Sequence, residues 1–147
     1  MTEPFYRNKL CIILTGLLWC HSVFAEPLWL KNENTSHLFD VEIADTPEKS
    51  KIGLMFRKHL DNDKGMLFLL PEKQPMYIWM KNNYISLDML FFDTDGKIVK
   101  IISDTTPLSL KTLPSDIPVA GVLEVNAGTA KRLNITVGDY IVSTRLK

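Results

Sequence analysis

A few polar side chains stand inside the most apolar stretch of the chain, residues 65–92 (GMLFLLPEKQPMYIWMKNNYISLDMLFF). Lys81 and Asn82 follow the second apolar run of this stretch, and Asp88 lies within the third. A carboxylate among apolar residues requires a charged or hydrogen-bonding partner, because its burial without one is strongly unfavourable. These three residues are therefore the first candidates for a binding site.

The partner of Asp88 decides what this region could do. In an extended strand over residues 85–92, Asp88 points to the same face as two apolar residues. Arg57, Lys81 and Asn82 are candidate partners, and Arg57 fits best because its guanidinium can bind a carboxylate through two hydrogen bonds. We hypothesise an Arg57–Asp88 pair, with Asn82 nearby, at the mouth of a pocket. The alternative is a structural pair that fixes a helix to a sheet.

Two further features could bind or act on a ligand. Tyr77 and Trp79 could form an aromatic platform for sugars or planar ligands, or they could be core residues. Glu124 together with Asp88 would supply the two carboxyl groups that acid–base cleavage of a glycoside requires, although the sequence sets no distance between them. The candidate binding residues are therefore Arg57, Trp79, Lys81, Asn82, Asp88 and Glu124.

Thioether groups favour Cu(I), which makes the methionines a possible copper site. Each of them, however, lies in an apolar run, where methionine commonly fills gaps in a core. The two histidines beyond residue 25 are not at a spacing typical of metal ligands, and we expect neither a metal nor a cofactor. The methionines beyond the first residue are Met55, Met66, Met76, Met80 and Met89.

The start of the chain has the pattern of a secretory signal peptide. Arg7 and Lys9 precede an apolar run at residues 10–18, and Ala25 offers a small residue at the cleavage position. The run is too short to span a bilayer comfortably, which takes about 20 residues. We predict a signal peptide over residues 1–25 and a periplasmic or secreted protein; contact with the membrane would arise only if this segment stayed uncleaved.

The remaining region, residues 26–147, is predicted to be one domain without cysteine, because Cys11 and Cys20 both lie in the signal segment. Thiol catalysis and cysteine-based zinc sites are thereby excluded. Removing the segment takes two basic residues and one acidic residue from 17 of each, so the charges remain nearly balanced. Such a surface offers no basic field for nucleic acid. We expect a monomer whose partner is a small molecule or a saccharide.

Short apolar runs separated by turns predict a mostly β protein, either an antiparallel β-sandwich or a partly open barrel, with one or two short helices. Thr46 is a suitable N-cap for the first helix, and Gly96 suits the turn of the clearest hairpin. Residues 104–120 read as a long crossing loop. The predicted strands cover 39–43, 66–70, 76–80, 85–92, 97–103, 122–125 and 140–144, and the helices 47–57 and 126–133.

Motifs spread over residues 39–142 resemble those of the family known as domain of unknown function 192. Asn83 and Ser86 depart from it, since Thr and Pro are usual at these positions. The resemblance implies a jelly-roll β-sandwich that is often exported, and it implies no activity. The motifs are GLMFR at 53–57, GMLF at 65–68, WMKN at 79–82, LD at 87–88, LEV at 123–125, AG at 127–128 and VGD at 137–139.

The sequence leaves three classes of function open. The first is an exported, non-catalytic ligand-binding or accessory module of the cell envelope, and we favour it. The second is a hydrolase or lyase that acts on an envelope saccharide through Asp88 or Glu124. The third is a copper-binding protein that uses its methionines.

Overall fold

The computed structural model of the chain describes residues 25–146. The predicted signal peptide lies outside the described residues except for Ala25. Most of the described residues belong to strands or to the loops between them, as the sequence predicts. The elements are β1 (Glu26–Lys31), β2 (Ser36–Ala44), α1 (Pro47–Ile52), β3 (Lys64–Gln74), β4 (Tyr77–Ile78), β5 (Leu87–Phe92), β6 (Ile98–Ile102), β7 (Leu113–Pro114), β8 (Val119–Asn126), α2 (Thr129–Arg132) and β9 (Tyr140–Ser143).

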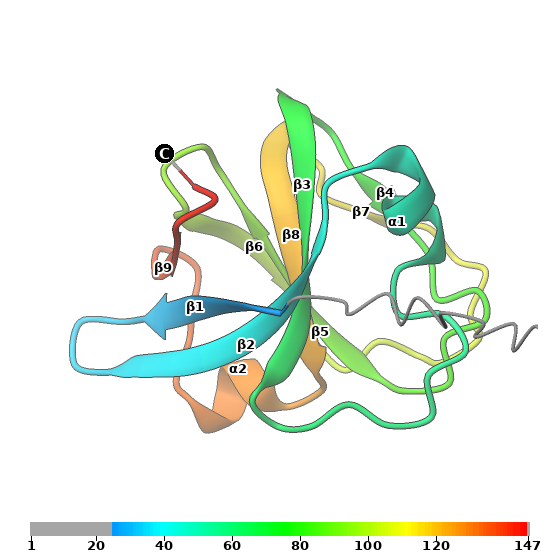
Figure 1. The fold of residues 1–147 in the computed structure, drawn as a ribbon, viewed down its shortest axis with the longest axis horizontal. Coiled ribbons are helices and arrows are strands. Elements are labelled where there is room, and N and C mark those ends of the chain that lie inside the picture. Colours follow the sequence, from blue (N-terminus) through cyan, green and yellow to red (C-terminus); the bar gives the residue numbers. More distant parts are fainter. Residues whose placement is uncertain (1–24, 147) are drawn as a thin grey trace, which may run out of the picture.

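Seven strands form one curled sheet in the order β6-β5-β8-β3-β2-β1-β9, and β4 pairs with β7 in a separate ribbon. The two edges of the large sheet approach one another, because the backbone N–H of Ile98 donates to Asp139 at 2.7 Å and that of Ile141 donates to Gly96 at 2.8 Å. The result is the partly open barrel visible in Figure 1. The mostly β fold is confirmed.

One pairing in the sheet departs from the antiparallel prediction. Strands β2 and β3 run parallel, whereas the other pairs of the large sheet are antiparallel. Parallel neighbours require a crossover of a dozen or more residues, and residues 45–63 with α1 provide it. This crossover carries α1 to the outer side of the sheet, where the candidate site lies.

The curled sheet separates two apolar clusters. The inner cluster fills the barrel with alternate residues from all seven strands, among them Leu28, Phe39 and Leu90. The outer cluster lies on the opposite face of β3, β5 and β8, under α1 and the loops around β4 and β7, and includes Phe68 and Val122. Strand β5 is buried along its whole length because it contributes to both clusters.

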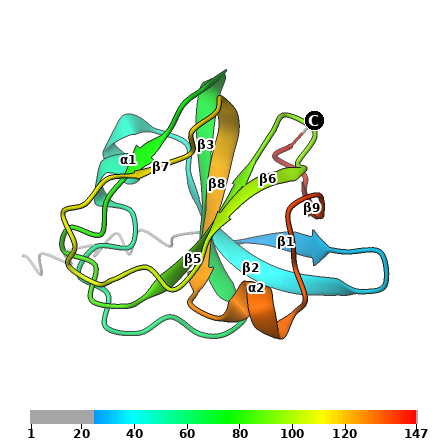
Figure 2. The same cartoon turned by 180° about the vertical axis from the view of Figure 1, so that it is seen from behind.

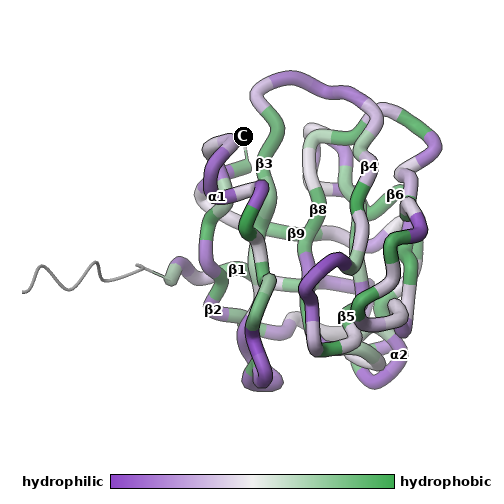
Figure 3. Tube along the Cα trace, turned by 90° about the vertical axis from the view of Figure 1, so that its right-hand side faces the viewer, coloured by the Kyte–Doolittle hydropathy of each residue, from purple (hydrophilic) through white to green (hydrophobic). Residues whose placement is uncertain are grey.

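The figures show these two lobes directly. In Figure 1, β1, β2 and β9 lie to one side of β3 and β8, and α1, β4 and β7 lie to the other; Figure 2 shows the same division from behind. In Figure 3 many strand segments are green, whereas connecting loops are largely purple. The apolar residues therefore concentrate where the strands face the two clusters.

Helix α1 begins as predicted and ends earlier than predicted. Thr46 caps it by accepting a hydrogen bond from the backbone N–H of Lys49, and Pro47 occupies the first turn. The helix stops at Ile52 because Gly53 adopts a φ of 49° and turns the chain. A Cβ at Gly53 would lie 3.0 Å from Cζ of Phe68, so glycine allows the expected close packing of this segment on the sheet.

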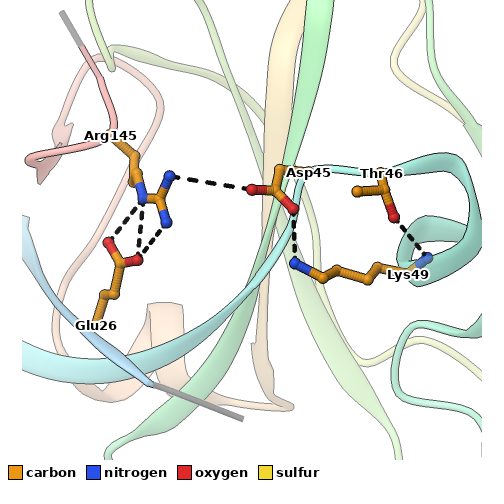
Figure 4. Close-up of polar contacts among 5 residues, drawn as sticks. All are labelled: Glu26, Asp45, Thr46, Lys49 and Arg145. Carbon is orange, nitrogen blue, oxygen red and sulfur yellow. Dashed lines mark hydrogen bonds and ion pairs between the residues drawn. The ribbon is translucent and has the colours of Figure 1, made fainter.

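An ion-pair network connects α1 to both ends of the described chain (Figure 4). Arg145 donates to Glu26 at 2.8 Å and lies 4.0 Å from Asp45, and Lys49 donates to Asp45 at 2.7 Å. Hydrogen bonds with these cations lower the pKa of both carboxyl groups. Because the network is largely exposed, it contributes little to stability.

Two strands deserve separate description. Residues 26–31 form β1, an interior strand that pairs with β2 on one side and β9 on the other, with Leu28 and Leu30 fully buried. The strand predicted over 76–80 is shorter in the structure. Only Tyr77–Ile78 is a strand, and Tyr77 and Trp79 are exposed by 73% and 48%.

Candidate functional site

A cleft of about 780 Å³ lies between α1, the β4 segment and the outer face of the sheet. Its walls are mainly apolar, and its floor is made by side chains of β3 and β8. Another hollow, of about 790 Å³, lies near Asn32 and Asp139, but none of its lining residues is buried. The cleft is lined by Glu48, Ser50, Lys51, Ile52, Gly53, Leu54, Met55, Phe68, Met76, Tyr77, Ile78, Trp79, Lys81, Asn82, Asn83 and Glu124.

Glu124 is the most unusual side chain of the cleft. It lies on the central strand β8, opposite Met66 of β3 and Met89 of β5, and is only 3% exposed. Within residues 25–146 its carboxyl group has no hydrogen-bond partner and no ion pair. Burial among apolar neighbours raises the pKa of Glu124 to about 8. A group with this pKa can change its protonation state near neutral pH when a ligand binds.

Asn83 is a second buried polar side chain in the same cleft. It is 5% exposed, and its Oδ1 has no hydrogen-bond partner among the described residues. Its Nδ2 contacts Sδ of Met80 at 4.0 Å, which is a weak interaction. The backbone holds the residue in place, since Asn83 N–H donates to Met80 and its carbonyl accepts from Leu108, both at 3.0 Å. A rigidly held orphan acceptor is rare in folded proteins.

Strained backbone surrounds this part of the cleft. Phe56, Asn82 and Leu108 adopt positive φ angles of 66°, 58° and 62°, a region that residues other than glycine seldom occupy. Hydrogen bonds connect the strained segments, because the N–H of Phe56 donates to the carbonyl of Asn82 at 2.8 Å. Such strain persists only where the surroundings enforce it, and it concentrates at functional sites.

The rim of the cleft exposes apolar and aromatic surface. Ile52, Tyr77 and Trp79 are exposed by 59%, 73% and 48%. The ammonium group of Lys81 lies 5.2 Å from the ring centroid of Trp79, in a cation–π arrangement. Exposed apolar groups gathered around a concavity are typical of a binding surface.

Asp88 is not part of this cleft. Its side chain is fully buried on the barrel side of β5, where it accepts backbone N–H groups of Asp104 and Gly128 at 3.1 Å and of Ala130 at 2.9 Å. It thereby fixes the start of α2 and the loop after β6. The hypothesised Arg57–Asp88 pair is wrong, because backbone amides fully occupy this carboxylate.

Arg57 instead pairs with Glu42 of β2. Both guanidinium NH2 groups donate to the carboxylate, one of them at 2.6 Å, which raises the pKa of Arg57. The pair is partly exposed and is absent from the lining of the cleft. Arg57 was predicted as a binding residue, and the structure places it beside the site as a structural partner of the sheet.

The register of the sheet separates the two carboxyl groups proposed for acid–base chemistry. Asp88 lies opposite Val125, which faces the inner cluster, whereas Glu124 lies opposite Met89, which faces the outer cluster. The two side chains therefore point to opposite faces of one sheet. They cannot flank the same glycosidic bond.

The methionines divide between core and cleft. Met66, Met80 and Met89 are buried in the outer cluster, as core filling predicts, and Met55 and Met76 line the cleft. Residues 25–146 contain no group of three or more His, Cys, Asp and Glu side chains that could hold a metal ion. Within the same range, no helix is long and apolar enough to cross a membrane.

Four of the six predicted site residues converge on the cleft, namely Trp79, Lys81, Asn82 and Glu124. The prediction did not select Asn83, Phe68 or the apolar wall. Asn83 stands in a turn between two apolar runs, where asparagine is common and usually exposed, so the sequence carries no signal of its burial. Phe68 carries no signal either, because its sequence context is that of an ordinary core residue.

A curled, mostly β barrel with a cleft on its outer face defines the class of this protein. The family model of domain of unknown function 192, described as an uncharacterised ACR, matches residues 29–143. The chain therefore belongs to this family. No curated protein matches it.

Two solved structures share the fold. One is a proposed transcription regulator from Sinorhizobium meliloti 1021, with 42% identity, a TM-score of 0.80, and coverage of 81% of this chain and 93% of that one. The other is a protein of unknown function from Novosphingobium aromaticivorans DSM 12444, with 34% identity, a TM-score of 0.78, and coverage of 80% and 84%.

Proposed function

We propose that this protein is a non-catalytic binding module that takes a small organic molecule into the cleft above Glu124. The observation that carries the proposal is a cleft lined by two buried polar residues: Glu124, whose carboxyl group forms no hydrogen bond or ion pair among residues 25–146, and Asn83, whose Oδ1 has no hydrogen-bond partner there. A buried polar group without a partner costs about 1–3 kcal/mol. A ligand that supplies the missing hydrogen bonds recovers this free energy, and that accounts for their presence.

The walls of the cleft support the same proposal. Phe68, Met55, Met76 and Trp79 provide apolar surface for the body of a ligand, and the carboxyl group of Glu124 at the floor would fix its orientation. Small-molecule sites typically combine an apolar lining with a few convergent polar groups, and their volumes are about 300–1,000 Å³. The cleft falls within that range.

Binding is favoured over the glycoside-cleaving alternative because Asp88 and Glu124 face opposite sides of the sheet. Saccharide remains a candidate ligand class, since Trp79 offers an exposed aromatic face. The Sinorhizobium relative is described as a proposed transcription regulator. The balanced charge of this chain offers no electrostatic attraction for nucleic acid, so we propose a small-molecule partner. The pattern of residues 1–25 supports an exported location in the periplasm or outside the cell.

Chemical-shift mapping tests the proposal. The purified protein is screened against aromatic and aliphatic fragments that include amines, alcohols, amides and carboxylates, and against monosaccharides. We expect at least one compound to saturate with shifts centred on Gly53, Asn83, the Trp79 indole and Glu124. In Glu124→Met this binding should weaken, whereas in Glu72→Gln, an exposed change on β3, it should persist. If no compound produces saturable shifts at the cleft, the proposal fails.

A further inference from the structure

We infer that the molecule bound in this cleft is an organic amine with an apolar body, whose ammonium group pairs with the carboxyl group of Glu124. The inference rests on the proposed function and specifies its ligand class. It follows from three properties of the cleft: the unpaired carboxyl group of Glu124, the distribution of charge between floor and rim, and the apolar lining.

The carboxyl group of Glu124 has no partner within the described part of the chain. An ionised carboxylate can only accept hydrogen bonds, and no donor among residues 25–146 forms a hydrogen bond or an ion pair with it. An ammonium group would bring three donors and the opposite charge on one small group. A carboxylate or ether ligand would bring only further acceptors.

The charges around the cleft favour a cation at its floor. Glu124 is the only buried ionisable group in the lining, and its potential is least screened by solvent. Glu48, Lys51, Lys81 and Tyr77 also face the cleft, but all four are exposed at the rim, where water and salt screen them. Once Glu124 is ionised, a positive charge beside it therefore meets a net attraction.

The apolar lining offers a place for the body of an amine. Phe68 and Met76 are among the lining residues and would contact that body. The Trp79 ring at the rim already contacts the ammonium group of Lys81, 5.2 Å from its centroid, so the charged group of the ligand is left to Glu124. The lining thus provides places for both parts of such a molecule.

Binding of an amine should be linked to release of a proton. Burial keeps Glu124 neutral below a pH of about 8, and a bound ammonium group favours its ionised form. Below that pH, each bound amine should release about one proton, and the affinity should rise about tenfold per pH unit. Above it, the affinity should level off until the amine itself loses its charge.

Three probes with one body and different head groups test the inference: phenethylamine, 2-phenylethanol and phenylacetate. Isothermal titration calorimetry on the whole protein at neutral pH, in phosphate and in Tris, gives affinity and proton release together. We expect phenethylamine to bind about tenfold or more tightly than 2-phenylethanol, with phenylacetate the weakest. Glu124→Gln should remove most of this preference, and Glu72→Gln should preserve it. A folded spectrum of each variant accompanies the titration.

These titrations can separate a wrong ligand class from a wrong binding site. If 2-phenylethanol or phenylacetate binds at the cleft as tightly as phenethylamine, the amine inference is overturned and the proposed binding function stands. The same holds if phenethylamine does not bind while other fragments do, or if it binds equally well to Glu124→Gln. If no probe and no fragment binds at the cleft, both the inference and the proposed function fail.

Discussion

Asp88 and Glu124 are buried carboxyl groups on neighbouring strands of one sheet, and they differ in nearly every aspect of their surroundings. Asp88 faces the barrel and accepts three backbone N–H groups. Glu124 faces the cleft, lies between two methionines, and has no hydrogen-bond partner among the described residues. Because Asp88 is hydrogen-bonded within the protein, we interpret it as a structural residue. Because Glu124 has no such partner, we interpret it as a residue that binds a ligand.

Glu42 extends the comparison to a carboxylate near the surface. Its partner is the guanidinium of Arg57, and both side chains are partly exposed. Asp88 is thus stabilised by backbone amides and Glu42 by an opposite charge, whereas Glu124 has neither kind of partner. We therefore expect substitutions at these three carboxyl groups to change stability by different amounts.

The largest expected effect is a pH dependence of stability that belongs to Glu124. Its pKa is 4.5 in ordinary surroundings and about 8 when buried here. The unfolded chain therefore loses this proton first, and the free energy of unfolding should fall between these pH values by up to about 1.4 kcal/mol per unit. Below pH 4.5 the full contribution is present, and above 8 the curve should flatten.

Urea unfolding of wild type and Glu124→Met across this pH range isolates the effect, because the other titrations cancel in the difference. The variant should also be the more stable protein at neutral pH, since it removes a buried polar group without a partner. A difference curve that stays level with pH would contradict the assigned burial of Glu124.

Asp88→Asn should lower the free energy of unfolding, in contrast to Glu124→Met, which should raise it. An amide keeps one acceptor oxygen and places an NH2 group against backbone donors, so stability should fall by about 2–4 kcal/mol. Urea unfolding at neutral pH measures the loss. Asp95→Asn, in the exposed turn before β6, is the matched control and should change stability by less than about 0.5 kcal/mol. Equal effects of the two substitutions would remove the distinction between Asp88 and a surface carboxylate.

Gly53→Ala should be intermediate, at about 1–2 kcal/mol of destabilisation. The substitution combines positive φ with a Cβ that lies 3.0 Å from Phe68. Gly128→Ala is the control, because Gly128 also has positive φ but has no atom within 4 Å of the added Cβ. Thermal or urea unfolding of both variants compares the crowded position at Gly53 with the open, left-handed position at Gly128. An equal or smaller cost at Gly53 would contradict the expected crowding against Phe68.

The smallest effect is expected for Arg57. A double-mutant cycle of Arg57→Met with Glu42→Gln should give a coupling of about 0.5–1 kcal/mol, because the pair is partly exposed, and added salt should reduce it. The corresponding cycle of Arg57→Met with Asp88→Asn should give no coupling. Measurable coupling in the second cycle would mean that Arg57 and Asp88 interact, which would contradict the structure.

Much of the fold was accessible from the sequence. Alternating residues such as Phe39, Val41 and Ile43 reveal a strand with one buried face, and the cap at Thr46 marks where α1 begins. The parallel pairing of β2 with β3 was not accessible, because a local pattern does not reveal which strand lies beside which. The length of α1 was missed because Gly53 acts through its positive φ and its contact with Phe68, which are tertiary features.

The candidate site was predicted in part for a similar reason. Polar residues in an apolar stretch drew attention to Asp88, Lys81 and Asn82, but sequence cannot tell a satisfied carboxylate from an isolated one. The backbone donors of Asp88 come from the loop after β6 and from the start of α2, far along the chain. Glu124 entered the prediction only as a partner of Asp88, and its own environment became visible once the faces of β8 were assigned.

The pairing of β1 with β9 also has a consequence for how the chain acquires its shape. Of the described strands, β1 leaves the ribosome first and β9 last, yet the two lie side by side in the sheet. Strand β1 therefore cannot pair with β9 until nearly the whole chain has been synthesised. Contacts so distant along the chain slow folding, and until they form, an open sheet edge is accessible to chaperones and proteases.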